Sequence, residues 1–133
     1  MELSNNGKHT EMITLLSEAL DALIDAIESG RVGFDYAVKE YADQADNELA
    51  SAFRSFVREM KLADHQPIYG DDDQIPDLSD ARRDALQHVA QRINVPEVTR
   101  FVEAMIEAQD QRLSVVKTLK SQAEQLRQER PPG

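Results

Sequence analysis

The residue types that most often do chemistry in proteins are cysteine, histidine, clustered carboxylates and activated serine, and this chain arranges few of them. It has no cysteine, which excludes disulfides, thiol nucleophiles and thiolate metal sites. Its histidines, His9, His65 and His88, lack the Glu-x-x-His partners with which helical bundles hold di-iron centres. No serine lies in a Gly-x-Ser-x-Gly motif. We therefore expect no catalytic residue, no cofactor and no enzymatic activity.

One acidic cluster has the right ligand atoms for a cation. Asp71, Asp72 and Asp73 lie in the segment 63–78, together with two prolines and a glycine. Carboxylate oxygens are the ligands that calcium prefers, but consecutive aspartates do not match the alternating ligand positions of an EF-hand loop. We interpret the segment as a long, solvated acidic loop. A hard-cation site or a contact with a basic partner is the alternative.

A pair of charged residues is expected to have a structural role. Glu59 and Arg92 each lie beside apolar positions that should face the core, on two successive predicted helices. An isolated charge there is costly, whereas a pair is tolerated. We therefore predict that Glu59 and Arg92 form an ion pair or cap the ends of neighbouring helices. His88, next to an inward valine, is expected at the surface or at the boundary of the core.

The elements that would position these residues are all helical. Six stretches repeat apolar residues every three or four positions, and none alternates with the period of two expected of a strand. The sequence therefore predicts an all-α fold, a six-helix bundle built from antiparallel helical hairpins. The predicted helices span about 11–29, 34–45, 48–62, 80–93, 96–109 and 115–130.

The ends of these helices carry recognisable signals. Gly30 ends the first helix, and Pro96 suits the first position of the fifth, which needs no amide donor. Small polar residues that can cap helix N-termini precede most of the helices. The candidates are Thr10 for the first, Asp46 or Asn47 for the third, Ser79 or Asp80 for the fourth, Asn94 with Glu97 as a capping box for the fifth, and Ser114 for the sixth.

The apolar stripes also predict the core and a possible interface. Phe53 and Phe56 lie on the inward face of the third helix, which we expect at the centre of the core. The stripe of the first helix is broader than one contact requires, so we expect part of it to be exposed and to mediate self-association. Asp21, Asp25 and Glu28 lie on the opposite face of that helix and are expected to be solvated.

Length and charge limit the possible functions. The chain has 133 residues, which suits one domain, here expected at 11–130 between a flexible segment 1–10 and a tail 131–133. With 25 acidic and 15 basic residues its net charge is −10, which disfavours binding to nucleic acid or anionic lipid. No run approaches the ~20 apolar residues of a spanning helix. We therefore expect protein partners and a water-soluble chain.

Several segments resemble the cytoplasmic domain of the type II secretion system F family, and within it the Tad-pilus branch. They are LLSEALDALIDAIESGRVGFDYAV in the first two predicted helices, ELASAFRSFVREMKL in the third, ALQHVAQRINVPEVTRFVEAMIEAQ in the fourth and fifth, and LSVVKTLKSQAEQLRQER in the sixth. The order and spacing of these segments carry the resemblance, which extends over nearly the whole chain.

This resemblance implies a non-catalytic domain of an inner-membrane platform protein in a type II secretion, Tad or type IV pilus system. Such a domain lies on the cytoplasmic face of the inner membrane and is attached to it through flanking transmembrane helices, which this chain does not contain. The implied partners are the hexameric assembly ATPase, other platform subunits and pilins, and a second copy in a homodimer. The implied role is to couple the ATPase to pilin movement.

Two other functions agree with the same sequence. The first is a soluble helical adaptor or regulator without a membrane anchor. The second is a metal-stabilised helical protein that uses Asp71, Asp72 and Asp73, which predicts that calcium raises its thermal stability.

Overall fold

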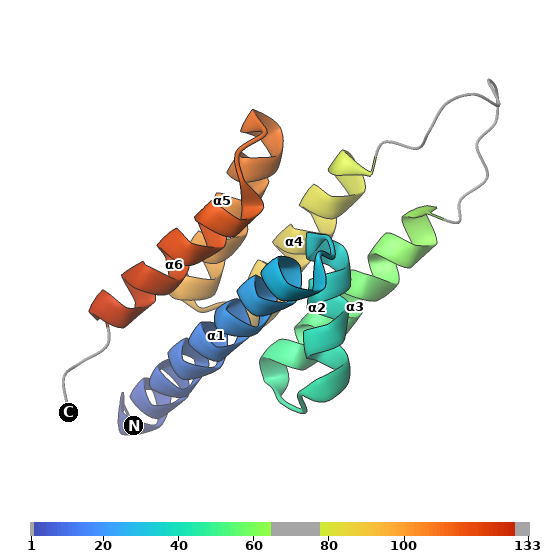
Figure 1. Ribbon diagram of the computed structural model, residues 1–133. Helices are drawn as coiled ribbons and strands as arrows, with labels where there is room; N and C mark the ends of the chain where they lie inside the picture. The colour runs from blue at the N-terminus through green and yellow to red at the C-terminus, as the bar shows by residue number, and fades with distance from the viewer. Residues whose placement is uncertain (1, 65–77, 130–133) are drawn as a thin grey trace, which may run out of the picture.

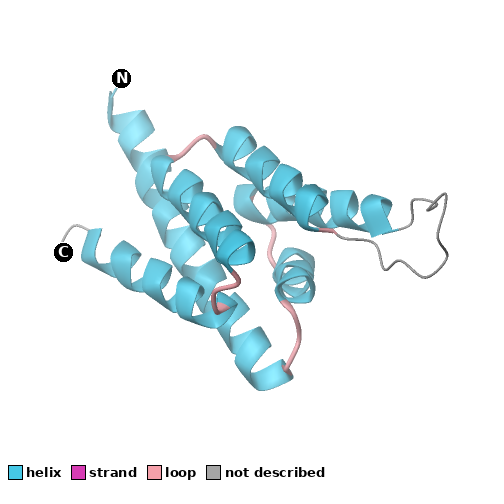
Figure 2. Cartoon of the chain, turned by 90° about the horizontal axis from the view of Figure 1, so that it is seen from above, coloured by secondary structure: helices cyan, strands magenta, loops and turns pink. Residues whose placement is uncertain are grey.

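Six α-helices make up the described part of the protein, and none of its residues forms a strand. A computed structural model describes the backbone of residues 2–64 and 78–129 and the side chains of residues 10–64 and 78–128. The prediction of an all-α bundle is confirmed (Figure 2). The helices are α1 (Glu2–Gly30), α2 (Phe34–Gln44), α3 (Glu48–Asp64), α4 (Ser79–Ile93), α5 (Pro96–Gln111) and α6 (Val115–Glu129).

The helices form a closed ring. Each helix packs against the next one along the chain, and α6 returns to pack against α1 (Figure 1). Two or three residues separate the helices in every connection except the one between α3 and α4. Such short connections reverse the chain direction and make neighbours pack as hairpins. Because the ring closes, each apolar stripe is covered by two neighbours.

The centre of the core is α3, as its two phenylalanines predict. Phe53 and Phe56 are both almost fully buried. The ring of Phe53 lies 5.8 Å from that of Tyr41 in α2 and 6.3 Å from that of Phe101 in α5, measured between centroids. Phe56 packs edge-on against Phe34 at 6.0 Å. The aromatic side chains on one face of α3 therefore contact both α2 and α5.

The prediction that α1 leaves an apolar face exposed is wrong for the side chains of residues 10–30. Leu16, Leu20 and Leu23 are buried, because α2 and α6 cover the stripe from two sides. Among the described side chains, the large apolar ones that are exposed are Tyr36, Leu62 and Leu113. The opposite face of α1 is solvated as expected. None of the helices between residues 2 and 64 or 78 and 129 is long and apolar enough to span a bilayer.

The first helix begins earlier than its apolar pattern indicates. The helix starts at Glu2, so most of the segment 1–10, expected to be flexible, is helical, and Thr10 is not a cap. The carbonyl of Thr10 accepts a hydrogen bond from Thr14 Oγ1 at 3.2 Å inside the helix. A polar stretch carries no apolar periodicity, and that periodicity was the signal used to place the helix start.

Two of the predicted N-caps are confirmed. The Ala50 amide donates to Asn47 Oδ1 at 2.8 Å at the start of α3, and Asn47 Nδ2 donates to the Tyr41 hydroxyl at 3.3 Å. At the start of α6, the Lys117 amide donates to Ser114 Oγ at 3.2 Å. Both bonds satisfy first-turn amides that have no partner inside their helix.

The caps predicted for α4 and α5 are wrong. Leu78 occupies the N-cap position of α4, and Ser79 is its first helical residue. Asn94 ends α4 in a left-handed conformation, with φ 54° and ψ 47°, while Val95 occupies the N-cap position of α5. With two residues between the helices, one must reverse the chain, and asparagine tolerates this conformation best after glycine. Pro96 begins α5 as predicted.

The Asn47 cap can be tested by urea denaturation. We expect Asn47→Ala to lower the free energy of unfolding by about 1–2 kcal/mol, because it removes the acceptor for the Ala50 amide. The Asn47→Asp variant keeps that acceptor and loses only the donor to Tyr41, so its loss should be smaller. Equal losses in the two variants would show that capping is not the stabilising contact.

Candidate functional site

Arg82, near the start of α4, connects three helices. Its Nε and Nη2 donate to the two carboxylate oxygens of Asp35 in the first turn of α2, at 3.0 and 2.7 Å. Its Nη1 donates to Gln109 Oε1 in the last turn of α5 at 2.8 Å. Two parallel bonds between a guanidinium and a carboxylate fix both groups in one plane. Arg82 therefore sets the relative position of three helix ends.

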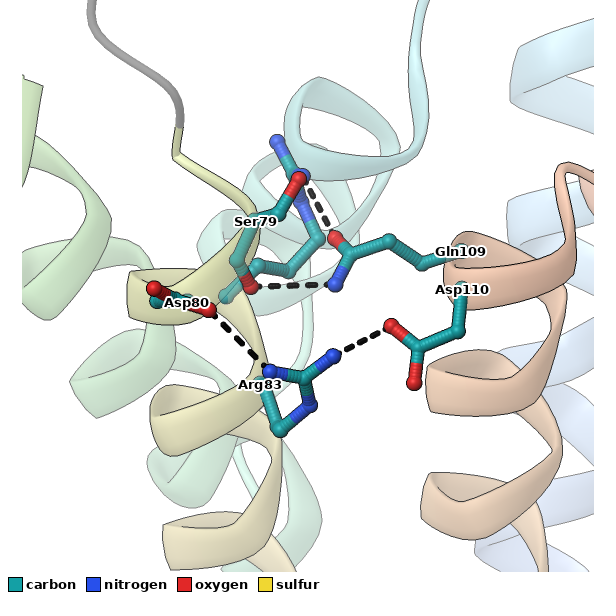
Figure 3. Close-up of polar contacts among 6 residues, drawn as sticks. Ser79, Asp80, Arg83, Gln109 and Asp110 are labelled. Carbon is teal, nitrogen blue, oxygen red and sulfur yellow. Dashed lines mark hydrogen bonds and ion pairs between the residues drawn. The ribbon is translucent and has the colours of Figure 1, made fainter.

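Gln109 extends this network back to the backbone of α4. Its Nε2 donates to the carbonyl of Ser79 at 3.0 Å, so one amide group contacts α4 at two points (Figure 3). The side chains of Arg82 and Asp35 are about one quarter and one third exposed. The network therefore lies at the boundary of the core, where a hydrogen-bonded ion pair is screened less than at the surface.

Arg83 makes a second link between the same two helices. It forms an ion pair with Asp110 of α5 and another with Asp80 of its own helix, the latter at 3.1 Å (Figure 3). The hydrogen bond to Asp110 raises the pKa of the Arg83 guanidinium above its usual value. All three side chains are solvent-accessible, so this link should contribute little stability and mainly limit how the helix ends can move.

A groove lies beside the Arg82 network, and we call it the end groove. Its volume is about 530 Å³, within the usual range for binding pockets. Buried apolar residues of α4 and α5 form its floor, and the exposed side chains of Tyr36 and Leu113 stand at its rim. The described lining residues are Gly33, Phe34, Asp35, Tyr36, Arg82, Leu86, Met105, Ala108, Gln109, Arg112, Leu113 and Val115.

The charge of the end groove is weakly positive. Asp35 and Arg82 neutralise each other through their ion pair. Arg112, which ends α5 in a left-handed conformation, also lines the groove. Its guanidinium forms no ion pair with any of the described side chains. The groove therefore offers an apolar surface with one available cation at its edge.

The predicted ion pair between Glu59 and Arg92 does not form. Glu59 Oε1 instead contacts His88 Nδ1 at 2.6 Å, and the Arg92 guanidinium donates to Ser55 Oγ at 2.9 Å and Ser51 Oγ at 3.1 Å. In the antiparallel pair of α3 and α4, position 59 faces position 88, and position 55 faces position 92. Glu59 and Arg92 are thus offset by one helical turn, about 6 Å along the axis.

Both residues still lie at the seam between α3 and α4, as expected, and His88 lies at the surface beside them. The other candidates cannot be placed. Asp71, Asp72 and Asp73 and His65 lie outside the described residues, and so does the side chain of His9. Within the described residues, no group of three or more histidine, aspartate or glutamate side chains could hold a metal ion.

Sequence reasoning missed the Arg82 network, although a local signal was present. Two consecutive arginines near the start of α4 oppose the positive end of the helix dipole. An unfavourable local arrangement of this kind indicates an acidic partner elsewhere in the fold. Asp35 is 47 residues away in sequence, so the signal could not have identified it.

Comparison with known proteins gave no relative: no family model, no curated protein and no solved structure matches this chain.

A double-mutant cycle on Asp35 and Arg82 tests the network. We expect a coupling energy of about 1 kcal/mol, between the values for exposed ion pairs and for buried bonds to charged groups, since both side chains are partly exposed. Urea denaturation of the two alanine variants and of the double variant measures it.

The control is the same cycle on Arg83 and Asp110, which are joined by a more exposed contact. We expect its coupling energy to be smaller. If the coupling energy of the Arg82–Asp35 pair is no larger than that of the Arg83–Asp110 pair, Arg82 is not the contact that sets the relative position of the three helix ends.

Proposed function

We propose that this chain is a protein-binding helical domain, the cytoplasmic domain of a platform protein in a type II secretion, Tad or type IV pilus system. Its role is to bind the assembly ATPase and to transmit the movement of that ATPase toward the pilin. In this proposal the end groove holds a segment of the ATPase. The flanking membrane segments and the pilins belong to the rest of the machine.

The exposed rim of the end groove is the observation that carries the proposal. Tyr36 is 51% exposed and Leu113 is 48% exposed, and both line a groove whose floor is apolar. A small ligand would fill the floor but leave the rim in water. A protein segment covers both, and apolar and aromatic side chains of this kind are concentrated at protein interfaces.

The charge of the chain supports the same choice of partner. A net charge of −10 disfavours nucleic acid and anionic membranes, and the guanidinium of Arg112, which pairs with none of the described side chains, suits a carboxylate on a partner segment. The occupant that fits best is a helix or strand with one or two large apolar side chains and an acidic residue beside them.

The resemblance in sequence supports the specific system. The segments that carry it extend over all six helices, and a six-helix, all-α domain is what the resemblance implies. The network around Arg82 supports the mechanical part of the role. A groove whose walls come from several helices can transmit a force only if the helices hold their relative positions, and Arg82 connects three of them.

The proposal can be tested with an assembly ATPase of a type II secretion, Tad or type IV pilus system from the same organism. We expect the two proteins to share a peak in size-exclusion chromatography with light scattering. Leu113→Asp should weaken the complex by about tenfold or more, because it replaces an apolar side chain at the rim with a carboxylate that the partner would have to desolvate and that can occupy the Arg112 guanidinium in the partner's place.

Leu62→Asp is the matched control, since Leu62 is 62% exposed but does not line the end groove. It should leave the affinity unchanged. Equal effects of the two substitutions would place the interface elsewhere, and the absence of any complex with the unaltered protein would contradict the proposed partner.

A further inference from the structure

A second groove, on the outside of α2 and α3, concentrates positive charge in an acidic protein. We call it the basic groove. Its volume is about 220 Å³, and Ala42 and Val57 provide apolar surface between its charged side chains. Among the described lining residues, Asp43 is acidic, and four are basic: Lys39, Arg54, Arg58 and Lys61.

Two of these four cations are available to a partner. Lys39 Nζ is paired with Asp43 at 2.9 Å. The guanidinium of Arg54 donates to the carbonyls that end α2, those of Ala42 at 3.1 Å and Ala45 at 2.7 Å. Arg58 and Lys61 are exposed and form no ion pair or hydrogen bond with the other described side chains. They lie one turn apart on the same face of α3.

The matching surface in this protein is the outer face of α1. Glu11, Glu18 and Asp25 are exposed and follow each other at intervals of seven residues, so they form one line of carboxylates along the helix. Glu11 and Glu18 have no cationic partner among the described side chains. The neighbouring Asp21 and Glu28 differ, because they face Arg127 at 3.7 Å and Lys120 at 2.9 Å in α6.

We propose that the basic groove of one copy binds the outer acidic face of α1 in a second copy. The charges on the two sides are complementary. Arg58 and Lys61, the two available cations, can contact the line of carboxylates formed by Glu11, Glu18 and Asp25. Arg54 adds positive charge beside them, although its guanidinium is bound to the carbonyls that end α2.

A second copy fits this groove better than an anionic polymer or membrane. The groove carries excess positive charge, so the remainder of the chain is more negative than its total of −10. An extended anionic surface would also approach this negative remainder and be repelled by it. A second copy is also net negative, but α1 presents one line of carboxylates on a convex helix surface, so only that line has to approach the groove, and its aliphatic carbons can pack on Val57.

The two surfaces are different, so the association joins unlike faces. Such contacts form a closed ring or an open chain, in which every copy uses both surfaces. The contact is formed largely by exposed charges, so it should be strong at about 0.01 M salt, where the screening length is ~30 Å, and weak at about 1 M, where it is ~3 Å. This association does not depend on the proposed binding of an ATPase.

Sedimentation equilibrium of the whole chain tests the proposal. We expect the unaltered protein to self-associate at low salt and to dissociate at high salt. The variant with Arg58→Glu and Lys61→Glu should associate at least about tenfold more weakly, and so should the variant with Glu18→Lys and Asp25→Lys. Circular dichroism should report intact folding in both, because all four side chains are exposed.

Mixing these two variants is the decisive measurement. In the mixture, the unaltered α1 of the first variant can bind the unaltered groove of the second, and the acidic groove of the first can bind the basic α1 of the second. Association should therefore return at low salt although neither variant associates alone. Failure of the mixture to associate would overturn the proposal, and so would a monomeric unaltered protein at low salt. The proposal would also be overturned if the association did not weaken at high salt. It would likewise be overturned if the basic groove bound vesicles of anionic lipid while the copies did not bind one another.

Discussion

The burial of one face of α3 is the constraint on which the rest of the structure depends. Phe53 and Phe56 lie on this face, and burying each contributes about 1.5–3 kcal/mol. Their rings contact Tyr41 and Phe34 of α2, and Phe101 of α5. Since α3 contacts helices from both halves of the chain, the halves cannot separate without exposing these rings. The closure of α6 against α1 then covers the remaining apolar stripe.

The polar contacts decide how the helices are aligned rather than whether they pack. Between α3 and α4, the contacts of His88 with Glu59 and of Arg92 with two serines repeat at an interval of one turn, so sliding by a turn would break all of them. At the end of the bundle, Arg82 does the same for three helix termini. Such contacts are individually modest in stability, but they select one register among several that bury a similar apolar area.

This division between an apolar core and polar contacts explains how a small bundle can carry two grooves of different character. The core needs only the inward faces, so the outward faces are free to carry apolar side chains at one place and cations at another. The end groove is apolar with one available guanidinium, whereas the basic groove is charged with only two small apolar residues. The two grooves thus differ in chemical character, and the polar contacts between helices fix the positions of the residues that line them.

The sequence by itself determined the features that depend on neighbouring residues. The period of 3.6 residues identified all six helices and the central position of Phe53 and Phe56, and the polar residues Asn47 and Ser114 identified two caps. These signals act within one or two turns. The polar start of α1 was missed because it has no such period.

Only the tertiary structure decided the features that depend on how helices meet. Asn94 could cap α5 or end α4, and the reversal between those two helices selected the second role. Glu59 and Arg92 could pair on local grounds, but the register of α3 against α4 places them a turn apart. The partners of Arg82 lie 27 and 47 residues away, and both grooves are lined by residues from more than one helix. Contacts over such distances depend on packing geometry, which no local pattern encodes.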